Sequence, residues 1–260
     1  MAGRESIHFV PVLAMLVLLA PSTVFAYAVL WDTSHGVVGD GDYQPSGYYQ
    51  TLVQHLGNNG FTVDTTSDGF LIDDPADYDV IVVCMASAYD TAYTSGEVER
   101  ILSFVNNGGG LLIMGDRQDR PGKDNEHIQP VADEFGVILG ISNLDLLHLY
   151  TSGMIDHAIF DGIGGIYMYA AGELTASSPT FAGAWKEGTG ETIAAVAEYG
   201  QGRVVALGDC SLWTASDNWD YFHEVDNPQF SVNTFEYLAI PEPVTVLLLG
   251  LGGLVLLRKR

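Results

Sequence analysis

The feature that most constrains this sequence is the uninterrupted apolar run at residues 80–86, within YDVIVVCMA at 78–86. From Val80 to Ala86 no polar residue breaks it, and its first four members are β-branched. A strand with one face in water alternates apolar and polar residues, whereas a strand buried on both faces is continuously apolar. The run therefore predicts a central strand in a sheet that is covered on both sides.

Shorter apolar runs predict further strands at residues 27–32, 61–66 and 111–116. Between them, residues 48–60 and 95–110 repeat apolar side chains at helical spacing and end in glycine or asparagine, which commonly terminate helices. The expected apolar stripes are Tyr49, Leu52, Val53 and Leu56 in the first helix, and Val98, Ile101, Leu102 and Val105 in the second, with Ser95 as its N-cap. This alternation predicts an α/β fold: a doubly wound, mostly parallel sheet with helices on both faces and right-handed crossovers.

The second half of the body is less regular. Residues 127–140 predict a helix that leads into a strand, and residues 192–209 predict a β-hairpin that turns at 199–202. Residues 227–239 predict a closing helix. The body, residues 27–238, is long enough for one domain with a single core.

The first 26 residues have the composition of a secretory signal peptide. Arg4 precedes the apolar stretch at residues 9–20, and small or apolar residues follow up to Ala26, after which we expect cleavage. A membrane helix that is not cleaved is the alternative. Pro11 and the short apolar core favour the signal peptide.

The last residues, 239–260, combine Pro241, Glu242 and Pro243 with an apolar segment at 244–257 and the basic end Arg258, Lys259 and Arg260. As a helix the apolar segment spans about 21 Å, against about 30 Å of bilayer hydrocarbon. It predicts a short C-terminal transmembrane helix whose basic end stays in the cytoplasm while the body lies outside. Such a tail is either an ordinary C-terminal membrane anchor or a sorting signal that directs the protein to its place in the cell.

The whole chain has a net charge of −23. Without Arg4, Glu5, Glu242 and the three terminal basic residues, 6 basic residues remain against 31 acidic ones, a charge near −25. Such a charge repels phosphate backbones, so we expect no nucleic-acid partner. It favours divalent cations, although surplus carboxylates also serve solubility alone.

The two cysteines, Cys84 and Cys210, fit an exported protein in either of two states. They form one disulfide, or both thiols stay buried and reduced, and the sequence does not decide because pairing needs Cα atoms within roughly 7 Å. There is no CxxC and no cysteine cluster typical of a metal site.

Four segments of the body carry a family resemblance: VLWDTSHG at 29–36, residues 78–116, GQGRVVALGDCSLWT at 200–214 and DNPQFSVNTFEYLA at 226–239. They resemble the class I glutamine-amidotransferase-like, flavodoxin-like domains of bacterial surface proteins. The resemblance implies the doubly wound fold and says little about activity. An active amidotransferase needs a cysteine between glycines, but Cys84 lies between Val83 and Met85. It also needs a histidine and a glutamate separated by one residue late in the chain, a pattern that the adjacent His223 and Glu224 meet only loosely.

The tail resembles the PEP-CTERM sorting signal of bacteria, on the Pro-Glu-Pro triplet at 241–243 and the basic residues at 258–260. The resemblance implies that the secretion machinery and an exosortase, a membrane cysteine transpeptidase, are partners of this chain. It also implies a transient tether through the C-terminal helix, followed by delivery to the cell surface or the extracellular space.

Ligands of doubly wound sheets bind at the carboxyl ends of the strands. The polar residues expected there form the predicted ligand crevice: Asp32, Ser34, His35, Ser87, Asp116, Asp209 and Ser211. Within it, Asp32 and Asp209 could hold His35 in one tautomer, or the carboxylates could share a cation. The alternative is that these side chains cap loops and helix starts. We assign no cofactor and no metal from the sequence.

Two functions are compatible with these features. The first is an exported, surface-sorted, non-catalytic binding or structural module in extracellular polymer, with polysaccharide as the expected ligand class. Its aromatic segments at 167–169, 211–214 and 218–224 would then form a sugar-binding platform, although such rings more often pack in cores or hairpins. The second is an extracytoplasmic hydrolase or sugar-modifying enzyme, with His35 as base and Asp32, Asp116 or Asp209 as orienting or metal-binding groups.

Overall fold

The computed structural model describes residues 26–39, 41–117, 125–144, 149–151, 153–169 and 171–239. The predicted signal peptide, apart from Ala26, lies outside the described residues, as does the predicted sorting signal from residue 240 onward, so both remain predictions. No helix in these described stretches is long and apolar enough to cross a membrane.

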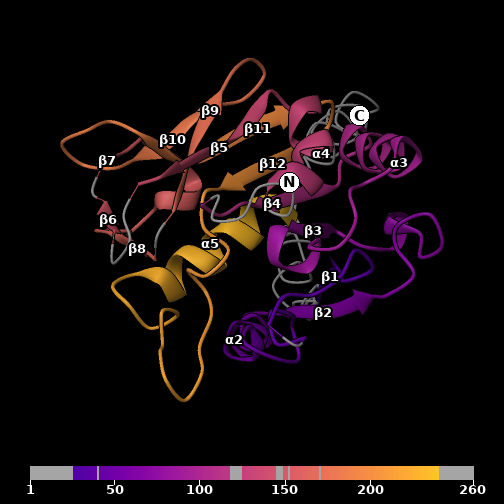
Figure 1. Cartoon of the computed structure of the whole chain (residues 1–260), viewed down its shortest axis with the longest axis horizontal. Coiled ribbons are helices and arrows are strands. Elements are labelled where there is room, and N and C mark those ends of the chain that lie inside the picture. The colour runs from indigo at the N-terminus through magenta and orange to yellow at the C-terminus, as the bar shows by residue number, and fades with distance from the viewer. Residues whose placement is uncertain are drawn as a thin grey trace, which may run out of the picture.

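The centre of the sheet consists of five parallel strands in the order β2-β1-β3-β4-β12 (Figure 1). Their bounds are Tyr27–Asp32 for β1, Phe61–Thr66 for β2, Val80–Cys84 for β3, Gly110–Met114 for β4 and Gly202–Leu207 for β12. All five residues of β3 and all five of β4 are buried. The predicted double-faced burial of the 78–86 run is therefore confirmed, and with it a mixed α/β fold whose central sheet is mostly parallel.

An antiparallel extension continues the sheet beyond β12. Strand β11 pairs with β12 as the predicted hairpin, with Tyr199 opposite Gly202. Next come β10 and β7, while β9 pairs with both β11 and β5, and β6 pairs with β8 in a separate small sheet. The bounds are β5 Val137–Asn143, β6 Leu149–Thr151, β7 Gly153–Met154, β8 Ile166–Met168, β9 Gly172–Ala176, β10 Phe181–Trp185 and β11 Thr192–Tyr199. The sequence predicted only part of this extension, because several of its strands have two or three residues and show no clear period.

The longer helices cover the central sheet in two pairs. Helix α2, Gln50–Asn58, contacts α5, Asn227–Ala239, whereas α3, Ser95–Asn106, contacts α4, Gln129–Glu134. In Figure 1 the two pairs lie on different sides of the central strands. The reason is topological: β1 to β2 and β3 to β4 step in opposite directions along the sheet, so right-handed crossovers place α2 and α3 on opposite faces.

Short 3₁₀ helices lie in the connections, at Pro75–Asp77 (η2), Met85–Ser87 (η3), Asn125–His127 (η4) and Ala158–Phe160 (η5). One connection differs from its prediction. Helix α3 is capped by Thr94 rather than by Ser95, through a reciprocal capping box in which the Glu97 carboxylate accepts from the Thr94 backbone N–H at 2.8 Å. The reason is the spacing, because Thr94 and not Ser95 stands three residues before a glutamate.

Both ends of the body lie at the amino-terminal edge of the sheet. Strand β1 begins at Tyr27, and β4 begins at Gly110, which pairs with Val80. A Cβ added to Gly110 would lie 2.5 Å from the backbone oxygen of Leu238, so this glycine lets the end of α5 approach the start of β4. The chain therefore enters and leaves the domain at one edge, and the opposite edge holds the predicted crevice.

Candidate functional site

The carboxyl ends of four parallel strands bring the predicted crevice residues to one edge. Asp32 is the last residue of β1, and Cys84 is the last residue of β3. Asp116 and Asp209 follow β4 and β12 by two residues each. Since β2 lies on one side of β1 and β3 on the other, the point where the strand order reverses is at β1. The side chains form two polar clusters at this edge.

The first cluster, here called the histidine clamp, surrounds His35 with two carboxylates. Its Nδ1 lies 2.9 Å from Asp32 Oδ2, and its Nε2 lies 3.2 Å from Glu97 Oε1. Ser34 Oγ lies 2.8 Å from the same Nδ1. The Tyr93 ring stacks on the imidazole with centroids 4.1 Å apart, and only 6% of His35 is exposed.

Protonation follows from these contacts. Burial alone lowers the pKa of His35, but the hydrogen bond and charge of Asp32 together with those of Glu97 outweigh burial and raise it above 6.5. Burial likewise raises the pKa of Asp32, yet its hydrogen bonds from His35, Tyr93 and Ser34 outweigh burial and lower it below 3.8. The geometry thus favours an imidazolium between two carboxylates.

A general base needs a ring nitrogen with a free lone pair that faces the substrate. In the histidine clamp both nitrogens of His35 already face carboxylates. Asp32 also accepts from the Ser34 backbone N–H at 2.9 Å and from the Tyr93 hydroxyl. This arrangement does not favour the predicted role of His35 as base, and it makes His35 a link between the end of β1 and helix α3.

The second cluster, here called the acid–thiol cluster, contains Asp116, Asp209, Cys84 and Cys210. The Cys210 thiol donates to Asp116 Oδ2 at 3.1 Å, and Cys84 and Cys210 each shift the pKa of the other. Asp209 accepts two backbone N–H bonds of 2.6 Å, from Tyr169 and from Ser211. Both thiols are free and buried. In this cluster the acids act mainly as acceptors that hold loops, as the alternative reading of the sequence predicted.

The two acids of this cluster have raised pKa values. Burial raises the pKa of Asp116 to about 7, outweighing the hydrogen bonds from Cys210 and from the Arg117 backbone. Burial and the neighbouring Asp116 raise the pKa of Asp209 far above 3.8. Asp116, Asp209 and Cys210 are the described residues that could hold a metal ion, because one ligand atom of each lies within 4.8 Å of the others.

Two further predicted residues take structural places. Ser87 is buried, where its hydroxyl donates to the Tyr43 carbonyl oxygen at 3.0 Å and accepts from Trp31 Nε1 at 3.2 Å. Cys84 has ordinary extended backbone angles, φ −120° and ψ 131°, rather than the strained turn of a nucleophile. His223 pairs with Asp220 at 2.7 Å in an exposed loop and not with Cys84.

Sequence reasoning missed Glu97, Tyr93 and Tyr49. The Thr94-to-Glu97 spacing was a signal for Glu97 as a helix cap, but it does not reveal that its other oxygen faces His35. Tyr49 was assigned to an apolar stripe, and its hydroxyl donates to the Cys210 carbonyl oxygen at 2.6 Å. No local pattern indicates these long-range contacts.

The aromatic segments mostly pack on one another. The Tyr169 and Tyr221 rings stack with centroids 5.0 Å apart, Trp219 stacks on Tyr221 at 6.3 Å, and Tyr48 meets Trp219 edge to face at 5.0 Å. Tyr48, Tyr169, Trp219 and Tyr221 are half-buried. These rings lie in the loops after β1, β8 and β12, so part of the aromatic surface belongs to the carboxyl edge.

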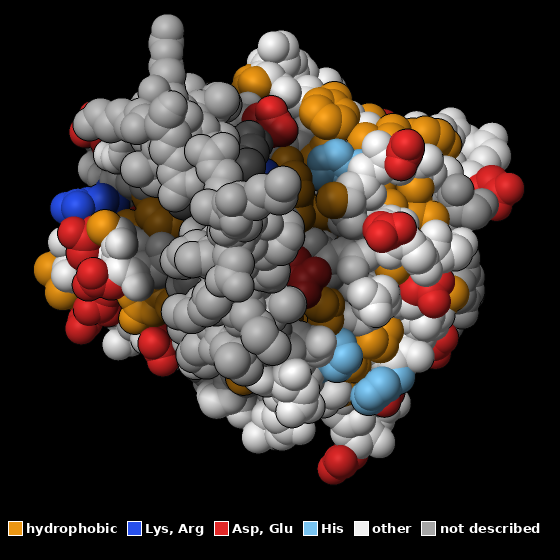
Figure 2. Space-filling view, turned by 180° about the vertical axis from the view of Figure 1, so that it is seen from behind, with side chains coloured by type: hydrophobic (Ala, Val, Ile, Leu, Met, Phe, Trp, Pro, Cys, Tyr) orange, Lys and Arg blue, Asp and Glu red, His pale blue; other side chains and the backbone are white. Residues whose placement is uncertain are grey.

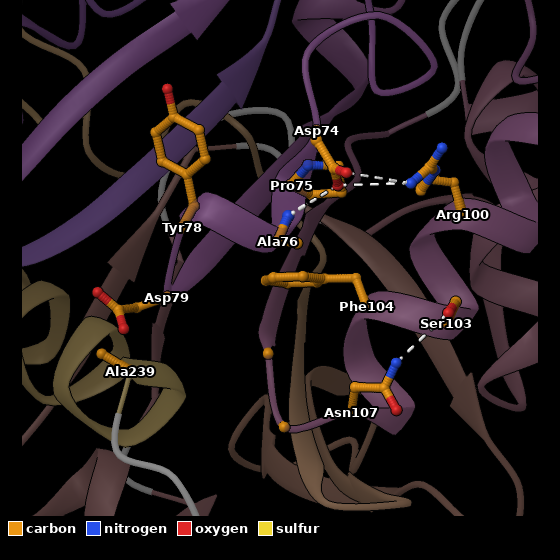
Figure 3. A pocket seen from close by; sticks show the side chains of 12 residues that line it. Asp74, Pro75, Ala76, Tyr78, Asp79, Arg100, Ser103, Phe104, Asn107 and Ala239 are labelled. Carbon is orange, nitrogen blue, oxygen red and sulfur yellow. Dashed lines mark hydrogen bonds and ion pairs between the residues drawn. The ribbon is translucent and has the colours of Figure 1, made fainter.

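A cavity of about 450 Å³ lies away from the crevice (Figure 3). It adjoins the amino-terminal edge, where Asp79 and Ala239 line it together with Phe104 and the Asp74–Arg100 pair at 3.4 Å. Gly109 also lines it, and a Cβ there would meet the Phe104 ring at 2.2 Å. Three further cavities of about 480, 410 and 240 Å³ lie elsewhere, and His35 lines none of the four.

The described surface is strongly acidic on the face that Figure 2 shows. Asp and Glu side chains are spread over it, whereas Lys and Arg are few. This distribution agrees with the net charge of −23 and favours neutral or cationic ligands over anionic ones.

No family model matches the chain, and no curated protein matches it. Solved structures share its fold at low identity. The N-terminal domain of mmIFT52 is 14% identical with a TM-score of 0.64, over 81% of this chain and 96% of that one. A cytoplasmic protein from Salmonella typhimurium is 17% identical with a TM-score of 0.56, over 82% and 99%. A ThuA-like protein from Bacteroides uniformis is 14% identical with a TM-score of 0.53, over 84% and 92%. These likenesses concern the fold and assign no activity.

Proposed function

We propose that this protein is an exported, non-catalytic binding module that is sorted to the cell surface. It has a doubly wound, glutamine-amidotransferase-like body between an N-terminal signal helix and a C-terminal transmembrane helix, and an exosortase cleaves it near Pro241, Glu242 and Pro243. The observation that carries the non-catalytic part is the histidine clamp, in which carboxylates occupy both nitrogens of His35. A ring in that state holds a structure together and has no lone pair for catalysis.

The placement of the chain ends supports surface display. The body begins at Tyr27 and its last helix ends at Ala239, both at the amino-terminal edge of the sheet. A tether at that edge would turn the opposite, carboxyl edge toward the surroundings. Half-buried rings such as Tyr48 and Trp219 lie in the loops of that carboxyl edge, where flat rings can stack on sugar faces. Extracellular polysaccharide is therefore the proposed ligand class.

Two measurements test the proposal. Cell fractionation with intact-mass analysis should find the protein outside the cytoplasm, cut after Ala26 and again near residues 241–243. A full-length, uncleaved product in the cytoplasm would contradict export and sorting.

For ligand binding, the mature protein is screened against neutral polysaccharides and for turnover of esters, amides and glycosides. We expect binding without turnover, weakened about two- to twelvefold by Trp219→Ala, since an aromatic stacking contact contributes about 0.5–1.5 kcal/mol. The matched control is Tyr78→Ala, a half-buried ring in the cavity at the amino-terminal edge, which should bind as the parent does. Reproducible turnover would overturn the non-catalytic assignment.

A further inference from the structure

The two cysteines are far apart in the sequence but meet in the fold. Cys84 ends β3 and lies opposite Met114 of β4, which on its other side lies opposite Leu207 of β12. The loop after Leu207 brings the Cys210 thiol to Asp116 beyond the end of β4, and Cys84 and Cys210 each shift the pKa of the other. Tyr49 touches both residues, with its hydroxyl 3.5 Å from Cys84 Sγ and 2.6 Å from the Cys210 carbonyl oxygen.

We propose that Cys84 and Cys210 are a redox pair that closes to one intramolecular disulfide when the chain is oxidised, tying the loop after β12 to the end of β3. Both thiols are buried, and the Tyr49 hydroxyl touches both residues, so the fold brings together the two cysteines whose pairing the sequence left open. The oxidant is a disulfide, either a small-molecule disulfide or that of a thiol oxidoreductase.

The chemistry balances as two thiol–disulfide exchanges. While the loop after β12 is still open, the Cys84 thiolate attacks the external disulfide, forms a mixed disulfide and releases one thiolate. As the loop closes, Cys210 loses its proton and attacks Cys84 Sγ, which expels the second thiolate. The two cysteines lose two electrons and two protons in total, and the external disulfide becomes two thiols.

The surroundings of the two sulfurs differ in a way that suits these steps. Burial raises the pKa of Cys84, but its contacts with Cys210, with Tyr49 and with the backbone N–H groups of Ala86 and Ser87 outweigh burial and lower it. The non-covalent contact with Cys84 and burial raise the pKa of Cys210. The proton of Cys210 has a second acceptor in Asp116, whose Oδ2 lies 3.1 Å away. This contact fixes the position of the Cys210 thiol beside the end of β4.

The test is refolding of the purified full-length chain in detergent with an excess of oxidised glutathione, followed by alkylation in denaturant and peptide mapping. We expect a monomer without alkylated cysteine and a reducible peptide that joins Cys84 to Cys210. Its Tm should exceed that of the reduced chain by about 5–15 °C, because the bond closes a long loop.

Cys84→Ser and Cys210→Ser are matched controls, and neither should show a Tm that depends on the oxidant. Two alkylated thiols in the oxidised wild type, a stable adduct with glutathione, or a cross-linked dimer would each overturn the proposal. Equal Tm values for the oxidised and reduced wild type would overturn the claimed tie between loop and strand. The experiment does not depend on export, so its outcome is independent of the proposed function.

Discussion

The two polar clusters at the carboxyl edge contain similar residue types but compensate their charges differently. In the histidine clamp, His35 lies between the carboxylates of Asp32 and Glu97, and each ring nitrogen has an acidic partner. In the acid–thiol cluster, two aspartates lie beside two thiols, and the raised pKa of Asp116, about 7, shows that a proton takes the place of a cation. The free-energy cost of burying an acid is thus offset by ion pairing in the histidine clamp and by protonation in the acid–thiol cluster.

This difference predicts that replacing an acid by its amide destabilises the histidine clamp and changes the acid–thiol cluster little. An acid paired with a buried cation cannot be replaced by its amide without leaving that cation poorly compensated. A protonated acid resembles its amide in charge and size, so the same replacement changes little. The following variants test this contrast, in order of decreasing effect.

The largest effect should come from Asp32→Asn. This change removes the charge that faces His35 and weakens the acceptor of the Ser34 N–H and the Tyr93 hydroxyl. We expect a loss of about 3–5 kcal/mol in the free energy of unfolding, the range for breaking a buried pair. Urea denaturation of the mature protein measures it. A loss below about 1 kcal/mol would show that the histidine clamp contributes little.

A smaller effect is expected from Glu97→Gln, because the amide oxygen can still cap helix α3 while the charge near His35 Nε2 is lost. The expected loss is about 1–2 kcal/mol at pH 6. The pKa of His35 in the folded protein lies above 6.5, so its contribution is fully present below pH 6.5 and is lost as the pH rises through the folded value. The difference between variant and parent should therefore shrink at high pH.

A titration of the His35 ring by NMR gives a direct measure of the same effect. Its pKa should fall in Glu97→Gln relative to the parent, because one of the two carboxylates that raise it is gone. The pH dependence of stability has the opposite sign for Asp32, because its pKa is lowered in the fold. Its contribution to the free energy of unfolding is present above pH 3.8 and is lost in acid as the pH falls through the folded value. An unchanged His35 pKa in the variant would contradict the clamp.

Asp116→Asn should cost no more than about 1 kcal/mol at pH 5, where the parent carboxyl is protonated in the fold. A raised folded pKa means that the parent loses stability as the pH rises from 3.8 to about 7, whereas the amide does not titrate. The free energy of unfolding of Asp116→Asn, relative to that of its parent, should thus increase between pH 5 and pH 8. Parallel urea titrations at the two pH values measure this gain, and a larger deficit at pH 8 than at pH 5 would contradict a raised pKa of Asp116 in the fold.

The smallest effect should come from Asp220→Asn, which breaks the His223–Asp220 pair. Its atoms are closer, at 2.7 Å, than the 2.9 and 3.2 Å of the histidine clamp, but its side chains are 60% and 50% exposed. Solvent screening limits such a pair to about 0.5 kcal/mol or less. Measured beside Asp32→Asn, this variant shows whether burial rather than distance decides the strength of the pair.

The structure explains why some elements were predictable and others were not. The runs at 27–32, 61–66 and 78–86 became strands at or within the expected positions, because their apolar pattern reports burial directly. The two-residue strand β7 and the three-residue strands β6 and β8 have no room for a period, so only their partners define them. The N-cap moved from Ser95 to Thr94 because a reciprocal contact with Glu97 selects one of two adjacent hydroxyls.

The sequence by itself determined the central α/β layout and which aspartates and serines stand at the ends of the strands, because periodicity and strand ends are local properties. Only the tertiary structure decided that Glu97 reaches His35, that Tyr49 bridges the two cysteines, and that Asp116 meets Cys210. Those contacts join residues far apart in the chain. Their energies depend on burial, and burial is a property of the folded whole.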